Sequence, residues 1–422
     1  APERKKGVNI DMYRHQDERL KETSPKLNSA AQKAYVEFIA QWAPRLDLSD
    51  PDSIGKAYTA GIGAGILEQA TEVRKYYYGN LITTYGVSYV SDACVENCAF
   101  CPAGKWNRGY RAKTLTTKET VADVLCTMLQ GHRRTCILQA NWSESRFLAK
   151  LEEWLPEVIR VCAPLGLVEI ILNVQTLSKA GYRIVTGLKN RVNPELCLQV
   201  RTFQETYNAE SYATLIPPSP MGNKGDMRLR LQGQSAASLA GIDAVGCGVL
   251  FGLNSRPLEE LAALVRHAQD LLDQDINLVR ICLPSAHGIS GLKTRIPFDL
   301  STVNQVYWQF SQLVYALARL ALPEMNWVMS ERDPANLRDE LAAYATETTV
   351  GVKPGVGDNL AAALDEQKGA HFVQATTYSE KSPEGYVRRT DRMGYKVDLN
   401  LSQAYRQPIQ TALKELGFCV GT

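Results

Sequence analysis

The sequence predicts an α/β protein built on a closed (βα)8 barrel of the TIM type, with an N-terminal helical extension and a C-terminal extension. Eight short runs rich in β-branched and apolar residues alternate with longer amphipathic runs, which is typical of parallel strands joined by helices. The number of such runs equals the number of strands in a closed barrel, and a barrel of this kind takes about 250 residues in one piece. The 422 residues of the chain leave room for both extensions. An open doubly wound sheet is the structural alternative.

Each element follows from the local pattern. Residues 1–78 are polar, contain few β-branched runs and are expected to be mainly helical. The expected strands lie at 81–89, 135–140, 167–173, 197–202, 245–251, 276–283, 326–330 and 346–350. The helical patterns between them lie at 117–129, 146–162, 235–240, 257–272, 301–320 and 334–345. The predicted organisation is therefore an extension over 1–78, a barrel over 79–350 and an extension over 351–422. The last of these ends in a predicted helix over 408–416, with Pro408 at its first position and Gly417 as its stop.

The charge balance argues for small-molecule partners. Forty-seven Lys and Arg residues face 45 Asp and Glu residues, a net charge of +2, whereas nucleic-acid or membrane-surface binders usually carry a basic excess. No run of about 18 apolar residues is present, so we expect no membrane span. The charged amino terminus is followed by no apolar stretch, so we expect no signal peptide and a cytoplasmic protein.

Three of the ten cysteines are close together in the sequence. Cys94, Cys98 and Cys101 fall within eight positions directly after the first predicted strand, on the face where barrel enzymes place their chemistry. Thiolates at this spacing suit either zinc or an iron–sulfur cluster. A structural zinc site needs four ligands, and the closest histidine, His132, is about thirty residues further on. A four-iron cluster with one iron open to a small ligand fits better. The other seven cysteines lie in apolar runs and are expected to be buried thiols.

The Cys-x3-Cys-x2-Cys spacing resembles that of the radical S-adenosylmethionine (SAM) enzymes. The resemblance implies a [4Fe–4S] cluster held by the three cysteines, S-adenosyl-L-methionine as a second cofactor, and a flavodoxin or ferredoxin-type electron donor. It also implies a 5′-deoxyadenosyl radical formed when the reduced cluster cleaves SAM. A zinc knuckle, three incidental thiols, or an iron–sulfur carrier without catalysis are the alternatives.

A second box points to a subgroup. Residues 199–207 read Gln-Val-Arg-Thr-Phe-Gln-Glu-Thr-Tyr and resemble the Gln-Glu-Thr-Tyr box of the aromatic amino acid lyases. These are 2-iminoacetate synthase, the tyrosine lyase of hydrogenase maturation and the tryptophan lyase of 3-methyl-2-indolic acid synthesis. Further similar stretches follow in the same order, so that the resemblance covers roughly 75–350. It implies cleavage of a carbon–carbon bond next to Cα of an L-amino acid, with an aromatic one, tyrosine or tryptophan, favoured.

The resemblance assigns five positions to the cofactors. Phe100 is expected to offer its backbone to the adenine, and Glu205 to face SAM at the end of the fourth strand. Arg230 is expected to bind the SAM carboxylate, since a guanidinium suits bidentate contacts. Asn141 and Asn173 end the second and third strands, where polar residues reach a cofactor. Each of three residues also has a structural alternative. Glu205 could be a solvated charge at a strand end, Arg230 a charge on a surface helix, and Asn173 a turn residue.

Other positions are assigned to the substrate and to catalysis. Arg332 matches the arginine that holds the amino acid carboxylate in the tryptophan lyase. Tyr89 matches an aromatic position before the cluster, and with Glu205 and Arg332 it completes the expected catalytic set. Ser330 and Thr349 are weaker candidates for hydrogen bonds to the substrate. Packing is at least as good an explanation for Tyr89, Ser330 and Thr349.

Two departures from the lyase pattern bear on this assignment. The usual Gly-Glu pair after the second strand, which holds the SAM amino group, reads Ala140-Asn141 here, and the usual Pro-Arg after the sixth strand reads Pro284-Ser285. Arg280 and His287 are candidates for the missing cation.

The cysteines outside the cluster motif bear on two relatives. The tail carries only Cys419, which argues against a second cluster there. Sulfur insertion of the biotin synthase type is the main rival activity, but Cys136 and Cys247 sit one or two positions from where it needs them, and a shift of one turns a strand side chain to the other face.

Overall fold

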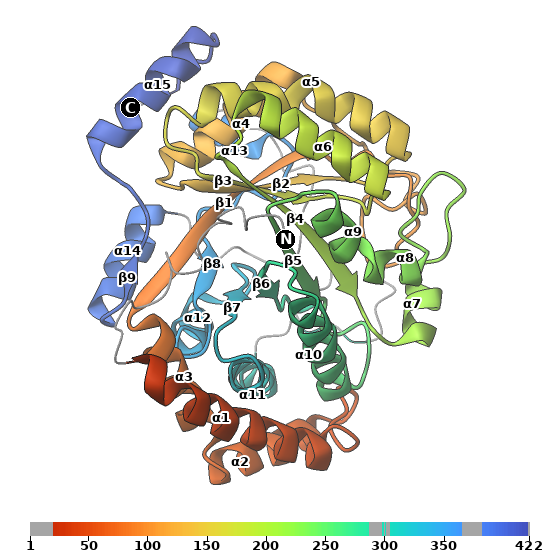
Figure 1. The fold of residues 1–422 in the computed structure, drawn as a ribbon, viewed down its shortest axis with the longest axis vertical. Coiled ribbons are helices and arrows are strands. Elements are labelled where there is room, and N and C mark those ends of the chain that lie inside the picture. The colour runs from red at the N-terminus through yellow and green to blue at the C-terminus, as the bar shows by residue number, and fades with distance from the viewer. Residues whose placement is uncertain (1–19, 287–297, 299, 301–303, 365–381, 421–422) are drawn as a thin grey trace.

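The computed structural model describes residues 20–286, 298, 300, 304–364 and 382–420, and in them the predicted barrel is confirmed (Figure 1). Each of its eight strands pairs in parallel with its neighbours, and β1 pairs with both β8 and β2, which closes the sheet. The strands are β1 Leu81–Ser91, β2 Arg134–Gln139, β3 Glu169–Asn173, β4 Cys197–Glu205, β5 Ala244–Val249, β6 Leu278–Cys282, β7 Asn326–Met329 and β8 Glu347–Thr349.

Helices surround the barrel. They follow their strands as the amphipathic pattern predicts, and α4 begins with a capping box in which Thr116 and Glu119 satisfy each other's backbone N–H groups. The barrel helices are α4 Thr117–Leu129, α5 Glu144–Cys162, α6 Lys179–Val192, α7 Ala209–Leu215, α8 Met227–Leu231, α9 Gly233–Leu239, α10 Pro257–Asp273, α11 Gln305–Ala321 and α12 Ala335–Leu341. The predicted helix over 301–320 begins among residues that lie outside the described part.

The segments before and after the barrel pack onto it. Helices α1 Leu20–Trp42, α2 Pro51–Gly63 and α3 Ile66–Tyr78 lie against α11, in the lower part of Figure 1. After β8 come α13 Asp358–Ala363, α14 Pro383–Arg392, β9 Lys396–Val397 and α15 Gln403–Glu415. Strand β9 pairs in parallel with the start of β1, so the carboxy-terminal segment extends the sheet. Among the described residues, no helix is both long and apolar enough to cross a membrane.

The last helix begins earlier than the sequence predicts. Helix α15 begins at Gln403, and the Ser402 hydroxyl caps it by accepting from the Tyr405 N–H. Pro408 therefore lies inside the helix, and its assignment to the first position was wrong because the Ser402 cap six residues earlier was overlooked. Gly417, with φ +80°, follows the helix end as predicted.

Two glycines on β5 make room inside the barrel. A Cβ atom on Gly246 would lie 2.6 Å from Gln199 Nε2, and one on Gly248 would lie 2.8 Å from a ring carbon of Phe203. Because strand side chains alternate between faces, the intervening Cys247 points away from these neighbours and packs in the outer core. The space that β5 leaves is taken by long side chains of β4 and β6.

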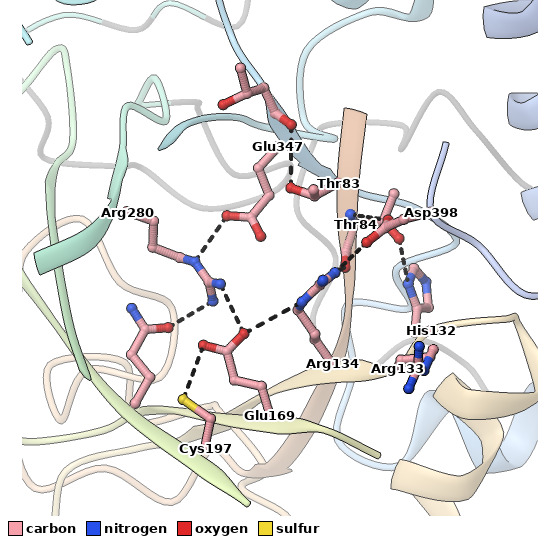
Figure 2. Close-up of polar contacts among 12 residues, drawn as sticks. Thr83, Thr84, His132, Arg133, Arg134, Glu169, Cys197, Arg280, Glu347 and Asp398 are labelled. Atoms are coloured by element: carbon pink, nitrogen blue, oxygen red, sulfur yellow. Dashed lines mark hydrogen bonds and ion pairs between the residues drawn. The ribbon is translucent and has the colours of Figure 1, made fainter. Parts of the chain in front are cut away.

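Buried ion pairs fill the amino-terminal end of the barrel (Figure 2). The Arg280 guanidinium lies 2.9 Å from Glu169 Oε2 and 2.9 Å from Glu347 Oε2, and all three side chains are at most 3% exposed. Arg134 extends the network, since it lies 3.7 Å from Glu169 and pairs with Asp398. Glu169, Glu347 and Arg134 are the first residues of their strands. Arg280 therefore sits at the opposite end from the cysteine loop, and its assignment to the barrel mouth was wrong.

Candidate functional site

A cavity of about 380 Å³ opens where the barrel strands end. Its walls contain all the residues that the resemblance assigned to the cluster, the cofactor or the substrate, though not Arg280, a candidate for the missing cation. These are Tyr89, Cys94, Cys98, Phe100, Cys101, Asn141, Asn173, Glu205, Arg230, Ser330, Arg332 and Thr349. The fold thus brings together residues from strands far apart in the sequence, while their individual roles stay predictions. His287 lies outside the described residues.

The cysteine loop is held by its own backbone and by neighbouring side chains. The Cys98 carbonyl accepts from the Cys101 N–H at 3.2 Å and from Trp106 Nε1 at 2.8 Å. Just before the loop, the Asp92 carboxylate accepts from the Tyr110 hydroxyl and the Lys113 N–H, both at 2.6 Å. These bonds hold the backbone that carries the three thiols.

The thiols have the chemistry that a cluster requires. None of the ten cysteines forms a disulfide. Burial raises the pKa of Cys94, that of Cys98 to about 11 and that of Cys101 to about 12, while the Lys224 ammonium lowers each. Such thiols keep their protons until a metal displaces them. In the described chain, no three His, Cys, Asp or Glu side chains are arranged to hold a metal ion.

Glu96 is a site residue that the sequence analysis missed. Its Oε1 atom accepts from the Asn141 side-chain amide at 3.2 Å and from the Lys224 N–H at 2.9 Å. Its Oε2 atom is buried without a hydrogen-bond partner, and the residue lines the cavity. A carboxylate oxygen in this state is prepared to accept a cationic donor. The available signal was the acidic residue between the first two cysteines of the motif.

Glu205 ends β4 in a strained conformation. Its φ of +69° is in the left-handed region, which is unusual for a residue with a side chain and concentrates at functional sites. The β4–β5 register shifts between Phe203 and Glu205, so the bulge turns the carboxylate toward the cavity. There Glu205 Oε1 lies 2.5 Å from Lys224 Nζ and 3.9 Å from Arg230 Nη2.

Lys224 links two of the predicted cofactor positions, although the sequence analysis did not select it. Its ammonium pairs with Glu205 and lies 5.6 Å from the centre of the Phe100 ring. Burial opposes the charged form, but Cys98 and Glu205 outweigh it and raise the pKa of Lys224. The cavity therefore carries a fixed positive charge beside the cysteines.

Arg230 is buried and not a surface charge. It lies in α8, is 3% exposed, and its Nε donates to the Phe203 carbonyl at 2.9 Å. This bond ties α8 to the end of β4 beside the bulge. The surface-helix alternative for Arg230 is wrong because the helix lies over the strand end.

The loops after β7 and β8 form the opposite wall. Ser330 Oγ accepts from the Arg332 N–H at 3.2 Å. The Glu331 carboxylate accepts from the Gly351 and Val352 N–H groups at 3.1 and 3.0 Å, which joins the two loops. Burial raises the pKa of Glu331 to about 7. Arg332 is thus carried on a loop with a buried anchor.

The middle of the barrel holds another residue that the sequence analysis missed, Arg201. It lines the floor of the cavity together with Tyr85, Cys136 and Cys282, and its Nη1 donates to the Tyr85 hydroxyl at 2.8 Å. The signal was a charged residue in the middle of a predicted strand. Cys247 does not line the cavity, so only one of the two cysteines considered for sulfur insertion faces it.

No protein-family model matches the chain. It is 25% identical over 189 residues to the 2-iminoacetate synthase of Salmonella typhimurium strain LT2, and 25% identical over 197 residues to that of Escherichia coli K12. These matches cover 45% of this chain and 46% and 48% of the relatives, so the chain spans about half the length of the curated relatives that it matches. The resemblance to the radical SAM aromatic amino acid lyase group is confirmed by these relatives.

Solved structures share the fold. The FeFe-hydrogenase maturase HydG from Carboxydothermus hydrogenoformans superposes with a TM-score of 0.68 at 23% identity, covering 95% of this chain and 86% of HydG. Methylornithine synthase (PylB) superposes with a TM-score of 0.57 at 17% identity, covering 89% of this chain and 99% of PylB. The (βα)8 barrel is therefore a fold that this chain has in common with both enzymes.

Proposed function

We propose that the chain is a radical SAM lyase that cleaves a carbon–carbon bond next to Cα of an L-amino acid, with tyrosine or tryptophan favoured by the resemblance. The observation that carries the proposal is that one cavity contains the cysteine loop, the strand-end residues expected at SAM and the arginine expected at the substrate. When bound, the [4Fe–4S] cluster and S-adenosyl-L-methionine supply a 5′-deoxyadenosyl radical that takes a hydrogen atom from the substrate.

Residues of the cysteine side are proposed to hold the cofactors. Cys94, Cys98 and Cys101 supply the thiolates. Glu96 receives the SAM amino group at its unpartnered Oε2, a charge that Asn141 cannot offer. Glu205 accepts from hydroxyl or amino donors. For the other positions, Arg230 and the Phe100 backbone are proposed to contact SAM, with Asn173 at the end of β3.

Residues of the β7–β8 side are proposed to hold the substrate. Arg332 binds the α-carboxylate, since a guanidinium matches a carboxylate with two parallel hydrogen bonds. Ser330 and Thr349 offer hydroxyl groups at the strand ends, and Tyr89 forms the wall before the cysteine loop. Fixing the amino acid between these groups orients the bond that breaks and excludes water from a radical.

The proposal includes partners and organisation. A flavodoxin or ferredoxin-type protein supplies the electron, and free cysteines suit a reducing cytoplasmic location. We further propose that residues 1–78 and 351–422 are extensions of a radical SAM barrel over 79–350. The described parts of both segments pack onto the barrel, and none of its eight strands lies in them.

Product analysis tests this function. The protein is reconstituted anaerobically with iron and sulfide and given SAM, dithionite and each of the twenty amino acids in turn. We expect one or a few amino acids to stimulate the formation of 5′-deoxyadenosine. Mass spectrometry should also detect the fragments that form when a carbon–carbon bond next to Cα of that amino acid breaks. A cluster without any SAM cleavage indicates a carrier, and a sulfur-containing product indicates sulfur insertion; either result overturns the lyase proposal.

A further inference from the structure

We propose that Arg201 is a carboxylate-binding residue at the floor of the cavity, and that the substrate is an L-amino acid whose side chain ends in a carboxylate. The proposal rests on the lyase function above and narrows its substrate class. It departs from tyrosine and tryptophan, whose side chains carry no carboxylate.

The Arg201 guanidinium is buried with at least three of its five N–H donors unused. The residue is 2% exposed and lines the cavity. Nη1 donates to the Tyr85 hydroxyl at 2.8 Å, and the guanidinium carbon lies 4.7 Å from the centre of the Tyr85 ring. Nε and Nη2 have no hydrogen-bond partner, and no described carboxylate forms an ion pair with Arg201. Burying a charge with unmade hydrogen bonds is costly, so the site is incomplete without a ligand.

The unused edge has a specific geometry. Nε and Nη2 are adjacent nitrogens whose N–H bonds run parallel, and this edge matches the two oxygens of one carboxylate. A single hydroxyl or indole N–H cannot satisfy both donors with one acceptor atom. The arginine remains charged at every physiological pH, so a ligand anion also neutralises the floor.

Arg280 is a structural arginine of the same barrel and serves as a comparison for Arg201. Arg280 is equally buried, but two glutamates, Glu169 and Glu347, lie 2.9 Å from its guanidinium (Figure 2). Arg201 lies on β4, which β5 separates from β6, and it forms no such ion pair with any described residue. Around it lie the Tyr85 hydroxyl, which Nη1 already uses, and the thiols of Cys136 and Cys282, which are weak hydrogen-bond acceptors. The Glu347 carboxylate also raises the pKa of Arg201, but its ion pair is with Arg280.

The position of Arg201 suits the far end of a substrate. It lies four residues before Glu205 on β4, which is about 13 Å along the strand toward the amino-terminal end of the barrel. Arg332 lies beyond the end of β7, on the rim. An amino acid held by its α-carboxylate at Arg332 can therefore extend its side chain down to Arg201. Arg332 on the rim would then bind the α-carboxylate, and Arg201 at the floor would bind the side-chain carboxylate of the same molecule.

Matched pairs of amino acids test the inference by binding alone. Binding to the reconstituted protein, with S-adenosylhomocysteine in place of SAM, is measured by calorimetry. The pairs are L-glutamate with L-glutamine, and 4-carboxy-L-phenylalanine with 4-carbamoyl-L-phenylalanine. In at least one pair the carboxylate should bind about 10- to 100-fold more tightly than the amide, the range expected for hydrogen bonds to a charged group.

Variants then locate the preference. Arg201→Gln should abolish the preference while leaving amide binding intact, and Arg201→Lys, which keeps the charge but loses the paired edge, should retain only part of it. Arg332→Ala should weaken both members of a pair equally. Equal binding of acid and amide by the wild-type protein overturns the inference even if the variants do not fold, and so does a preference that survives Arg201→Gln.

The two proposals fail differently. A carboxylate preference without 5′-deoxyadenosine from any amino acid contradicts the lyase function alone. Cleavage of SAM stimulated by tyrosine or tryptophan, with no preference for the carboxylate in either pair, contradicts the Arg201 inference alone.

Discussion

The Asn141 side-chain amide donates to Glu96 Oε1 at 3.2 Å, which joins the cysteine loop to the end of β2. In the lyases that this chain resembles, an acidic residue follows the second strand, and Asn141 takes its place here. The contact brings a carboxylate to the same wall from a different segment. Because Glu96 Oε2 is buried and unpartnered, the negative charge is relocated within the site and remains available to a ligand.

Glu96→Gln tests this relocation. Replacing the free oxygen by an amide N–H removes the acceptor and the charge, so SAM affinity should fall about 10- to 100-fold, as for a lost hydrogen bond to a charged group. Equilibrium dialysis with labelled SAM measures it, and the visible absorbance of the cluster should be unchanged. An affinity equal to that of the wild type removes Glu96 from the SAM site.

Arg332→Ala tests the substrate wall. Without the guanidinium, the α-carboxylate loses its paired contact, and we expect KM for the amino acid to rise about 10- to 100-fold. Cluster absorbance and SAM affinity serve as controls, since Arg332 lies beyond β7 and not in the cysteine loop. An unchanged KM would exclude the arginine from substrate binding.

Arg280→Met tests the ion pairs at the amino-terminal end of the barrel. Removing Arg280 leaves Glu169 and Glu347 buried without their shared cation, so the free energy of unfolding should fall by about 3–5 kcal/mol. Urea unfolding followed by circular dichroism measures the change. The matched control is the double variant Arg280→Met with Glu347→Gln. It removes one of the two unpaired carboxylates, so it should recover part of the lost free energy of unfolding. If the free energy of unfolding of Arg280→Met lies within about 1 kcal/mol of that of the wild type, roughly the value of an exposed ion pair, the assignment of a buried ion-pair network is contradicted.

His132 predicts how stability depends on pH. Burial lowers the pKa of His132 to about 4, and its Nε2 lies 2.9 Å from the Val350 carbonyl. The unfolded histidine gains its proton near pH 6.5, so between about pH 6.5 and 4 the unfolded chain binds more protons than the folded one. Stability from this residue is complete above that window and lost as the pH falls through it.

The expected size is about 2 kcal/mol between pH 7 and pH 5. Urea unfolding of the wild type and of His132→Asn at both pH values isolates this contribution, because other titrating groups act on both proteins. We expect a smaller loss on acidification in the variant. Equal losses would show that His132 does not stay neutral in the folded chain.

The barrel and the cluster loop were predictable because their signals are local. Strand and helix periodicities can be counted along the chain, and the cysteine spacing is contained in eight residues. The end of each strand also indicates the catalytic face. Asn173, Glu205 and Thr349, which the resemblance to the lyases placed at strand ends, all line the cavity.

What could not be predicted depends on register and on contacts between distant segments. Arg201 and Arg280 lie on β4 and β6, on either side of β5. Only the arrangement of the strands shows that Arg280 forms ion pairs with two glutamates and that Arg201 forms none with a described carboxylate. Lys224 reaches the site because the segment after α7 folds back over β4. Helix α15 was misplaced because Pro408 was taken as a start while Ser402 held the cap.

The cleavage of SAM by the reconstituted protein tests the central claim most directly. Wild-type protein and Cys98→Ala are loaded with iron and sulfide, reduced with dithionite and given SAM with the twenty amino acids, and 5′-deoxyadenosine is quantified by mass spectrometry. The account predicts amino acid-stimulated 5′-deoxyadenosine from the wild type and none from the variant, which has lost a thiolate ligand. Equal cleavage by both proteins, or none by a wild type that carries its cluster, would contradict it.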